Sequence, residues 1–162
     1  SHLHNLPALF AEYPDARVVI SHRDPLRVLG SLTDLMATLH WMRSDHPHHE
    51  GLVKAMSFGS FFQLEKVMQE RASGAVPGGQ IFDVRYLELV ADPIGTVRKV
   101  YAHFEIPFTR GFHERLEARL AGRPREARGS HEYSFEDTGL DLATERARLA
   151  RYQGHYGIAS EV

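Results

Sequence analysis

Cysteine is absent from the 162 residues of this chain. Its absence excludes a disulfide framework, a thiolate nucleophile and any cysteine-ligated zinc or iron–sulfur site. No apolar run approaches the roughly 20 residues that a membrane-spanning helix needs, and no charged-then-apolar signal segment opens the sequence. We therefore expect a soluble, cytoplasmic protein without a membrane span, whose chemistry depends on His, Ser, Tyr, Arg or carboxylates.

An excess of positive charge is also lacking, because 19 Lys and Arg residues stand against 21 Asp and Glu residues. A nucleic-acid partner is therefore not expected, since such binding depends mainly on neutralising phosphates. Lysine is scarce, and Lys54, Lys66 and Lys99 stand beside sixteen arginines. Arginine is the better bidentate partner for phosphate or sulfate, although a genome biased toward Arg codons explains the same ratio.

The remaining composition is that of a folded protein, with 43% hydrophobic and 25% charged residues. These values are close to average globular usage and exclude a disordered, collagen-like or coiled-coil chain. The length corresponds to one domain. We expect residues 1–162 to form a single, partial domain.

Local patterns predict two strands, over residues 17–22 and 80–86, where β-branched runs are bounded by turn signals. Asp24-Pro25 and Asp92-Pro93 each combine an N-cap residue with a proline at the first helical position. Apolar residues at helical spacing predict helices over 3–13, from 25, over 53–71, from 93, over 112–120 and over 141–155. Expected core residues include Phe58, Phe61, Phe62, Tyr101, Phe104, Leu142, Leu149 and Tyr152.

The order of strand, long helical excursion, strand and helix predicts an α/β layer with parallel strands. Two strands are too few for such a sheet, and the sequence contains no glycine-rich loop of the Walker type. We therefore expect that the first strand and its phosphate loop are missing. The exposed sheet edge would be covered by a missing N-terminal half or by a partner chain.

Residues 16–32 are the most informative stretch for function. A predicted strand leads through Arg23 to the start of a helix that then presents Ser31, about 9 Å along the helix axis from Pro25. Ligands of open α/β sheets bind beyond the carboxyl ends of the strands, which is where Arg23 would lie. The alternative is that Arg23 pairs with a nearby carboxylate and that Ser31 merely occupies a helix surface.

The run from Leu9 to Ser31 includes Tyr-Pro-Asp-Ala-Arg-Val-Val-Ile-Ser-His-Arg-Asp-Pro. This run resembles the central nucleotide-binding segment of sulfotransferases that use 3′-phosphoadenylyl sulfate. In that family an Arg at a strand end and a Ser eight residues later bind the 3′-phosphate of the cofactor. Arg23 and Ser31 match this spacing. The resemblance therefore implies that both residues bind the donor.

Two later segments extend the resemblance. The stretch from Phe82 to Pro93 is similar to the strand of the family that ends in a Tyr, which implies that Tyr86 contacts the adenine side of the cofactor. Residues 123–140 resemble the late loop of the bacterial branch that supplies an Arg and a Gly to the 3′-phosphate. Arg128 and Gly129 are carried over, with Arg125 as the competitor.

The resemblance implies the C-terminal part of a helix-rich, P-loop-type α/β domain with three layers and a parallel sheet. It also implies transfer of a sulfuryl group from 3′-phosphoadenylyl sulfate to a hydroxyl or amine of a small-molecule, lipid or glycan acceptor, leaving adenosine 3′,5′-bisphosphate. The isolated chain is expected to be incomplete and inactive. Alternatives are a related nucleotide kinase and a non-catalytic nucleotide-binding or protein-interaction fragment.

The same resemblance offers a catalytic base, because many members place a His about twenty residues before the 3′-phosphate Arg. His2 stands 21 residues before Arg23 and His4 stands 19 residues before it, so both are in range. A neutral imidazole with a pKa near 6.5 can accept a hydroxyl proton. We favour His2 as the base, with His4 and neither residue as the alternatives.

A second histidine cluster consists of His46, His48, His49 and Glu50. Imidazole and carboxylate groups suit zinc, nickel or copper. Pro47 prevents a regular helical presentation of these side chains. We therefore expect no metal site here and consider that the loop borders the acceptor pocket instead.

Overall fold

The computed structural model describes residues 2–45, 49–122 and 134–162. Contacts divide the chain into two compact units. We call the unit formed by Ser1–Pro14, Arg23–Pro77 and Tyr133–Val162 the helical unit, and the unit formed by Asp15–His22 and Gly78–Glu132 the sheet unit.

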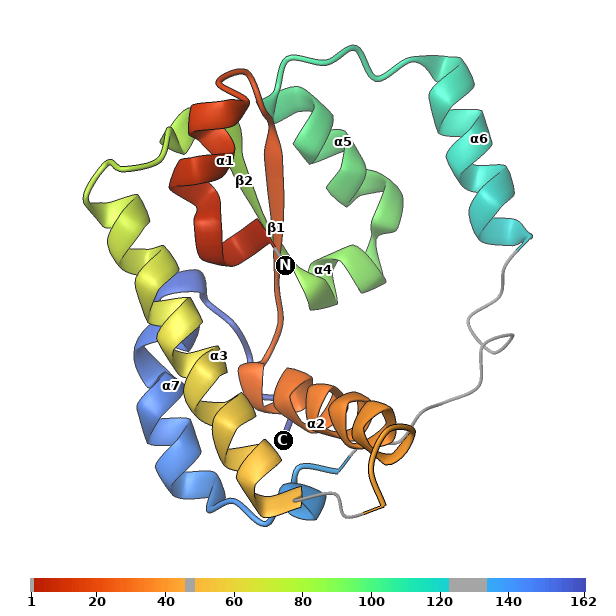
Figure 1. Ribbon diagram of the computed structural model, residues 1–162. Coiled ribbons are helices and arrows are strands. Elements are labelled where there is room, and N and C mark those ends of the chain that lie inside the picture. Colours follow the sequence, from red (N-terminus) through yellow and green to blue (C-terminus); the bar gives the residue numbers. More distant parts are fainter. Residues whose placement is uncertain (1, 46–48, 123–133) are drawn as a thin grey trace. The chain divides into compact units, whose positions relative to one another are not determined.

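The sheet unit contains strands β1 (Val18–His22) and β2 (Ile81–Arg85), which pair in parallel (Figure 1). Val18 lies opposite Ile81 and His22 lies opposite Arg85, so the two strands end in register. The parallel α/β arrangement that the element order predicted is confirmed. After β2 come α4 (Tyr86–Ala91), α5 (Pro93–His103) and α6 (Arg110–Ala121), and the 3-10 helix η2 (Gly78–Gln80) precedes it.

The helical unit contains η1 (His2–Asn5), α1 (Leu6–Glu12), α2 (Pro25–Trp41), α3 (His49–Ala72), η4 (Glu136–Thr138) and α7 (Leu142–Tyr156). The long helix α3 packs against both α2 and α7 (Figure 1). One core cluster joins Leu26 and Leu29 of α2 to Phe135 and Leu149. The burial of these side chains connects α2 to the C-terminal part of the sequence.

The expected helix starts are confirmed by their caps. The Asp24 carboxylate accepts a hydrogen bond from the amide of Leu26, and the Asp92 carboxylate accepts one from the amide of Gly95. Proline follows each of these aspartates, because its missing N–H costs nothing at the first helical position. Local sequence chemistry therefore sets where α2 and α5 begin.

One helix start and one short helix were not predicted. α3 begins at His49 and continues through Gly51, whereas the sequence predicted an interruption up to that glycine. Contacts of α3 with neighbouring helices outweigh the modest cost of one glycine in a helix. The short helix α4, directly after β2, was also missed.

Three expected core positions are wrong. Phe58 and Phe62 of α3 are 66% and 61% exposed, and Leu142 of α7 is 41% exposed. By contrast, Phe104, Leu149 and Tyr152 are buried as expected. The apolar residues of α3 point in several directions around the helix, so its sequence pattern alone does not identify the buried face.

The described helices include none that is both long enough and apolar enough to cross a membrane. The described strands are β1 and β2. The expected P-loop-type layering and a missing first strand therefore stay predictions.

Candidate functional site

The candidate anion site begins where β1 ends. His22 is the last residue of the strand and is buried, and its ring nitrogen Nε2 lies 2.8 Å from Oδ1 of Asp83 on β2. This contact ties the carboxyl end of β1 to its neighbouring strand. Arg23 follows as the single residue between the strand and the Asp24 cap of α2.

Arg23 forms a bidentate ion pair with Glu161. Its Nε donates to Oε1 and Oε2 of Glu161 at 3.0 and 2.9 Å, and its Nη2 donates to Oε2 at 2.7 Å. The Arg23 side chain is 32% exposed and the Glu161 side chain is 14% exposed. The guanidinium is therefore oriented by a planar oxyanion, which is the geometry that arginine also offers to phosphate.

Asp24, next to Arg23, is completely buried and accepts hydrogen bonds from residues near the end of the sequence. Its Oδ1 accepts from Nη1 of Arg146 at 2.7 Å, and its Oδ2 accepts from the amide of Glu161 at 2.6 Å. Burial by itself would raise the pKa of the Asp24 carboxyl, but these hydrogen bonds, the Leu26 amide and the Arg146 charge outweigh burial and lower that pKa. Asp24 is thus an ionised structural anion that fixes the Glu161 segment beside Arg23.

Ser31 lies on α2 and is partly buried. Arg27 precedes it by one helical turn, so the two residues occupy neighbouring positions on one helix face. Arg27 was not selected from the sequence, although its spacing of four residues from both Arg23 and Ser31 is the signal that could have identified it. An anion beside Ser31 would therefore have a second cation within reach.

Gly30, adjacent to Ser31, lies close to the late segment of the chain. A Cβ added to Gly30 would lie 3.5 Å from the carbonyl oxygen of Ser134. Phe135 anchors this segment in the core together with Leu26 and Leu29. The late segment is thereby held against α2 beside Ser31. Arg125, Arg128 and Gly129 lie outside the described residues.

Tyr86 is the first residue of α4 and directly follows β2 in the sheet unit. Its side chain is partly buried. It therefore lies at the carboxyl end of a parallel strand, where open α/β sheets bind their ligands. The contact of Tyr86 with the adenine side of the cofactor stays a prediction.

The predicted base belongs to η1, which opens the helical unit. His2 is a residue of this 3-10 helix, and its side chain lies outside the described part. His4 is exposed, and its carbonyl oxygen accepts a hydrogen bond from Nζ of Lys66 on α3. That contact fixes the backbone of η1 against α3.

The histidine-rich segment before α3 gives no metal cluster among the described residues. His46, Pro47 and His48 lie outside that part. Nε2 of His49 lies 3.4 Å from the carbonyl oxygen of Asp137, an exposed contact with the segment around η4. Glu50 pairs with Lys54 at 2.6 Å along α3. His49 thus contacts η4, and Glu50 pairs with a residue of its own helix.

Comparison with known proteins decides the family. Residues 1–110 match the family model described as "Sulfotransferase family". The chain belongs to the sulfotransferase family. The matched residues include η1, the β1–α2 connection with Arg23, α2 with Ser31, and the start of α4 with Tyr86. The family assignment made from sequence resemblance is confirmed.

Solved sulfotransferase structures resemble this chain over nearly all its length. Sulfotransferase STF9 from Mycobacterium avium superposes with a TM-score of 0.86 at 23% identity, covering 99% of this chain and 41% of STF9. Sulfotransferase STF1 from Mycobacterium tuberculosis H37Rv gives a TM-score of 0.71 at 30% identity, covering 93% of this chain and 38% of STF1. None of the curated proteins matches the sequence.

This sulfotransferase chain spans about two fifths of the length of each mycobacterial structure. Three residues that the sequence did not identify belong to its candidate site: Arg27, Arg146 and Glu161. Arg146 and Glu161 are separated from Asp24 by 122 and 137 residues, and no local spacing pattern connects positions that far apart.

Proposed function

We propose that this sulfotransferase chain binds the 3′-phosphate end of 3′-phosphoadenylyl sulfate. In a protein that supplies the remaining parts, it takes part in sulfuryl transfer to a hydroxyl or amine. The observation that carries this proposal is the position of Arg23 at the β1–α2 connection, and of Ser31 on α2, in a family member. Adenosine 3′,5′-bisphosphate is the corresponding product.

The electrostatics of the β1–α2 connection support an anion at Arg23. The N-terminus of α2 contributes the positive end of a helix dipole, and Arg27 adds a cation one turn before Ser31. Arg23 already holds a carboxylate, that of Glu161, in bidentate fashion. A phosphate presents the same kind of oxygen pair and carries more charge, so it can replace this carboxylate.

The late segment supports the assignment of Arg128 and Gly129 to the same phosphate. Ser134 lies against Gly30, the neighbour of Ser31. Arg128 and Gly129 stand six and five residues before Ser134, and six residues span at most about 20 Å. The sequence connection therefore permits both residues to serve the phosphate that Ser31 binds. Tyr86 is assigned to the adenine side.

The transfer step needs a base for the acceptor hydroxyl, and we assign this role to His2. The acceptor oxygen attacks sulfur and forms the new S–O bond, while the S–O bond to the 5′-phosphate breaks and its electron pair stays on that phosphate. The hydroxyl proton passes to the imidazole of His2. Catalysis then depends on in-line positioning and on cations around the leaving phosphate.

The 5′-phosphosulfate would bind a phosphate loop outside these 162 residues, because the sequence contains no Walker-type glycine-rich loop. Either an upstream segment of the same chain or a second chain could supply that loop. We also propose that the protein acts in the cytoplasm.

Calorimetric titration tests donor recognition. Adenosine 3′,5′-bisphosphate is compared with adenosine 5′-monophosphate, which lacks only the 3′-phosphate, and with ATP. We expect the bisphosphate to bind at least about tenfold more tightly than either competitor, because it alone makes charge-assisted hydrogen bonds at the 3′-position. Equal affinity for all three, or a preference for ATP, would contradict the proposal.

A further inference from the structure

The ion pair of Arg23 and Glu161 lies within the helical unit and uses one edge of the guanidinium. Nε and Nη2 of Arg23 are the two donors of that edge, and both donate to the Glu161 carboxylate over distances of 2.7 to 3.0 Å. A phosphate that binds arginine in bidentate fashion needs two parallel N–H donors of the same kind. Glu161 therefore uses donors that the proposed 3′-phosphate also needs.

A phosphate and the Glu161 carboxylate would repel each other at this guanidinium. The Glu161 side chain is 14% exposed, so water screens its negative charge only weakly. A phosphate adds more than one further negative charge at neutral pH. Because this repulsion grows as the two anions approach the same cation, phosphate binding and the ion pair with Glu161 exclude each other.

The backbone at Glu161 is held by hydrogen bonds that do not involve Arg23. The Glu161 amide donates to Oδ2 of the completely buried Asp24 at 2.6 Å. The carbonyl oxygen of Val162 accepts from Nη2 of Arg146 at 2.8 Å, and Arg146 also pairs with Asp24. The ion pair with Arg23 can therefore open while these backbone contacts persist.

The chain is anchored before Glu161 as well. The amide of Ile158 donates to the carbonyl oxygen of Gln153 at 2.9 Å, and the Ile158 side chain packs against a buried cluster of helix residues. Ala159 and Ser160 stand between the two anchors and are exposed. The Glu161 side chain can thus turn toward water by rotation about its own bonds, without a movement of the backbone.

We propose that Glu161 is a side-chain gate for the anion site at Arg23. The Glu161 carboxylate and the 3′-phosphate bind the guanidinium in turn, while the backbone of residues 157–162 stays in place. The gate lowers the affinity of every anion for Arg23 by the same factor, so inorganic phosphate and sulfate, which lack an adenosine group, are kept off this site. This inference rests on the proposed function, because it takes Arg23 as the ligand of the 3′-phosphate.

Two substitutions separate the reach of Glu161 from its charge. Glu161→Gln removes the charge and keeps the length of the side chain. Glu161→Asp keeps the charge and shortens the side chain by one carbon–carbon bond, about 1.5 Å. Because the backbone is held, this change takes contacts of 2.7 to 3.0 Å beyond hydrogen-bond distance. Both variants should therefore open the gate.

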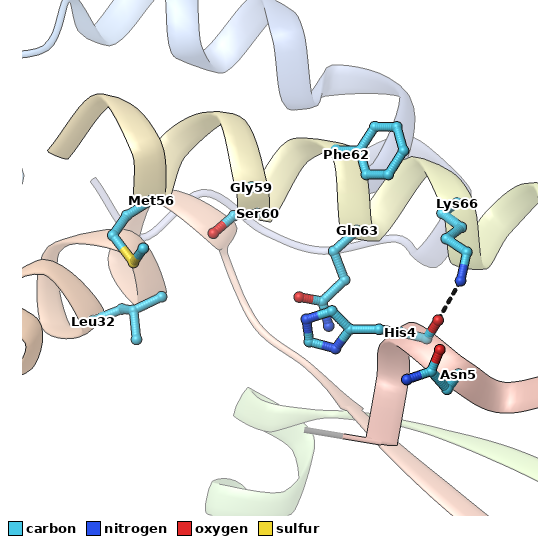
Figure 2. A pocket seen from close by; sticks show the side chains of 9 residues that line it. All are labelled: His4, Asn5, Leu32, Met56, Gly59, Ser60, Phe62, Gln63 and Lys66. Atoms are coloured by element: carbon cyan, nitrogen blue, oxygen red, sulfur yellow. Dashed lines mark hydrogen bonds between the residues drawn. The ribbon is translucent and has the colours of Figure 1, made fainter. Parts of the chain in front are cut away.

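A second partly buried glutamate of the same unit provides the matched control. Figure 2 shows a cavity between η1, α2 and α3, with Lys66 of α3 at one end. Nζ of Lys66 lies 3.1 Å from Oε1 of Glu70, whose side chain is 17% exposed. The residues that line this cavity are all described, and they do not include Arg23 or Glu161. Glu70→Gln thus removes a carboxylate of similar burial from a different cation.

Surface plasmon resonance on the immobilised 162-residue chain measures the rate constants for adenosine 3′,5′-bisphosphate. An exclusive gate reduces the fraction of chains that can receive the phosphate, and this fraction multiplies the association rate constant. We expect association to be about three- to tenfold faster in Glu161→Gln and in Glu161→Asp. Dissociation should stay within about twofold of the wild type, because Glu161 has already left Arg23 in the complex. Glu70→Gln should leave both rate constants within about twofold.

Hydrogen exchange of the Glu161 amide, followed by nuclear magnetic resonance, tests the second half of the inference. Its exchange rate in the wild type should stay within about threefold when the bisphosphate binds, since the bond to Asp24 persists. A large acceleration would show that the whole segment detaches, which would overturn a gate made by the side chain alone. Circular dichroism checks that each variant is folded.

The rate constants leave clear alternatives. Unchanged association in both Glu161 variants would overturn the gate, and faster association in Glu161→Gln alone would reduce it to a long-range charge effect. Slower dissociation in the variants would mean that the two anions share the guanidinium, and faster dissociation would mean that Glu161 supports the bound phosphate, so either result overturns the inference.

Titration of the wild type with adenosine 5′-monophosphate separates this inference from the proposed function. If the bisphosphate binds more tightly than the monophosphate and the Glu161 variants keep the wild-type rate constants, the gate fails alone. If the bisphosphate has no preference over the monophosphate, the donor assignment fails and the gate fails with it.

Discussion

The guanidinium of Arg23 and the carboxylate of Glu161 form a bidentate pair although 138 residues separate them. The amide of Glu161 also donates to the buried Asp24 carboxylate, which fixes this C-terminal segment at the start of α2. Arg23, the residue assigned to phosphate binding, is thus already paired with a carboxylate of its own chain. A bound phosphate has to displace that carboxylate or share the guanidinium with it.

Glu161→Gln should strengthen the binding of adenosine 3′,5′-bisphosphate by about three- to tenfold. The reason is that the neutral amide competes less well than a carboxylate for the charged guanidinium of Arg23. Calorimetric titration at fixed ionic strength measures the change.

Glu12→Gln is the matched control for that substitution, because it also removes one negative charge, at an exposed position on α1. Weaker binding by Glu161→Gln would show instead that Glu161 holds Arg23 in its binding orientation.

Arg23→Ala should weaken bisphosphate binding by about 1.5 to 3 kcal/mol, and Ser31→Ala should weaken it by about 1 kcal/mol. Arg23 contributes charge-assisted hydrogen bonds, whereas Ser31 contributes a neutral hydroxyl. Arg43→Ala removes an exposed arginine just after α2 and should leave the affinity nearly unchanged. Equal affinities of the wild type and a folded Arg23→Ala variant would refute the assignment.

Asp24→Asn should destabilise the fold by about 3 kcal/mol at neutral pH, because it removes the partner of Arg146 from a buried site. Folding lowers the pKa of this carboxyl from its ordinary value of 3.8. Its stabilising contribution is therefore complete above that ordinary value and is lost as the pH falls through the lower, folded-state pKa.

Urea titrations at several pH values between neutral and strongly acidic measure this effect. The free energy of unfolding of the wild type should fall more steeply below the ordinary carboxyl pKa than that of Asp24→Asn. Asp15→Asn, at an exposed turn position, should retain the wild-type slope. Parallel curves for the wild type and Asp24→Asn would mean that Asp24 does not contribute this acid sensitivity.

Phe135→Ala should cost about 3 to 5 kcal/mol of folding free energy, because Phe135 is 3% exposed and fills the core beside Leu26 and Leu29. Leu142→Ala, at a 41% exposed position of α7, should change stability by only about 0.5 kcal/mol. Thermal unfolding of both variants tests whether the late segment is anchored as described. Similar melting temperatures would contradict that anchoring.

His2→Asn should reduce sulfuryl transfer by about 10²- to 10⁴-fold, the usual contribution of general-base catalysis, without changing bisphosphate affinity. The assay measures transfer of labelled sulfate to a panel of phenol, sugar and lipid acceptors by a longer protein that includes this chain and an upstream phosphate loop. The 162-residue chain alone should give no measurable transfer, because one end of the donor is then not fixed.

His4→Asn distinguishes the two histidines in the same assay. Retained transfer in His2→Asn, with a loss in His4→Asn, would move the base to His4. Robust transfer by the 162-residue chain alone would show that the phosphate-binding element lies within it.

The sequence by itself determined the features that depend on neighbours in the chain. Asp24-Pro25 and Asp92-Pro93 start helices as predicted, and the β-branched run before His22 forms a strand, because caps and backbone preferences act over a few residues. The resemblance of residues 9–31, which include Arg23 and Ser31, likewise implied the sulfotransferase family, which the comparisons confirm.

Tertiary structure decided which side chains meet across long sequence separations. It alone brought Glu161 to Arg23 and Arg146 to Asp24, and it left Phe62 of α3 exposed although the residue is strongly apolar. It also formed the cavity between His4, Leu32 and Gln63. These outcomes follow from the packing of whole helices against one another, and residue spacing within a single helix does not specify which neighbour each face receives.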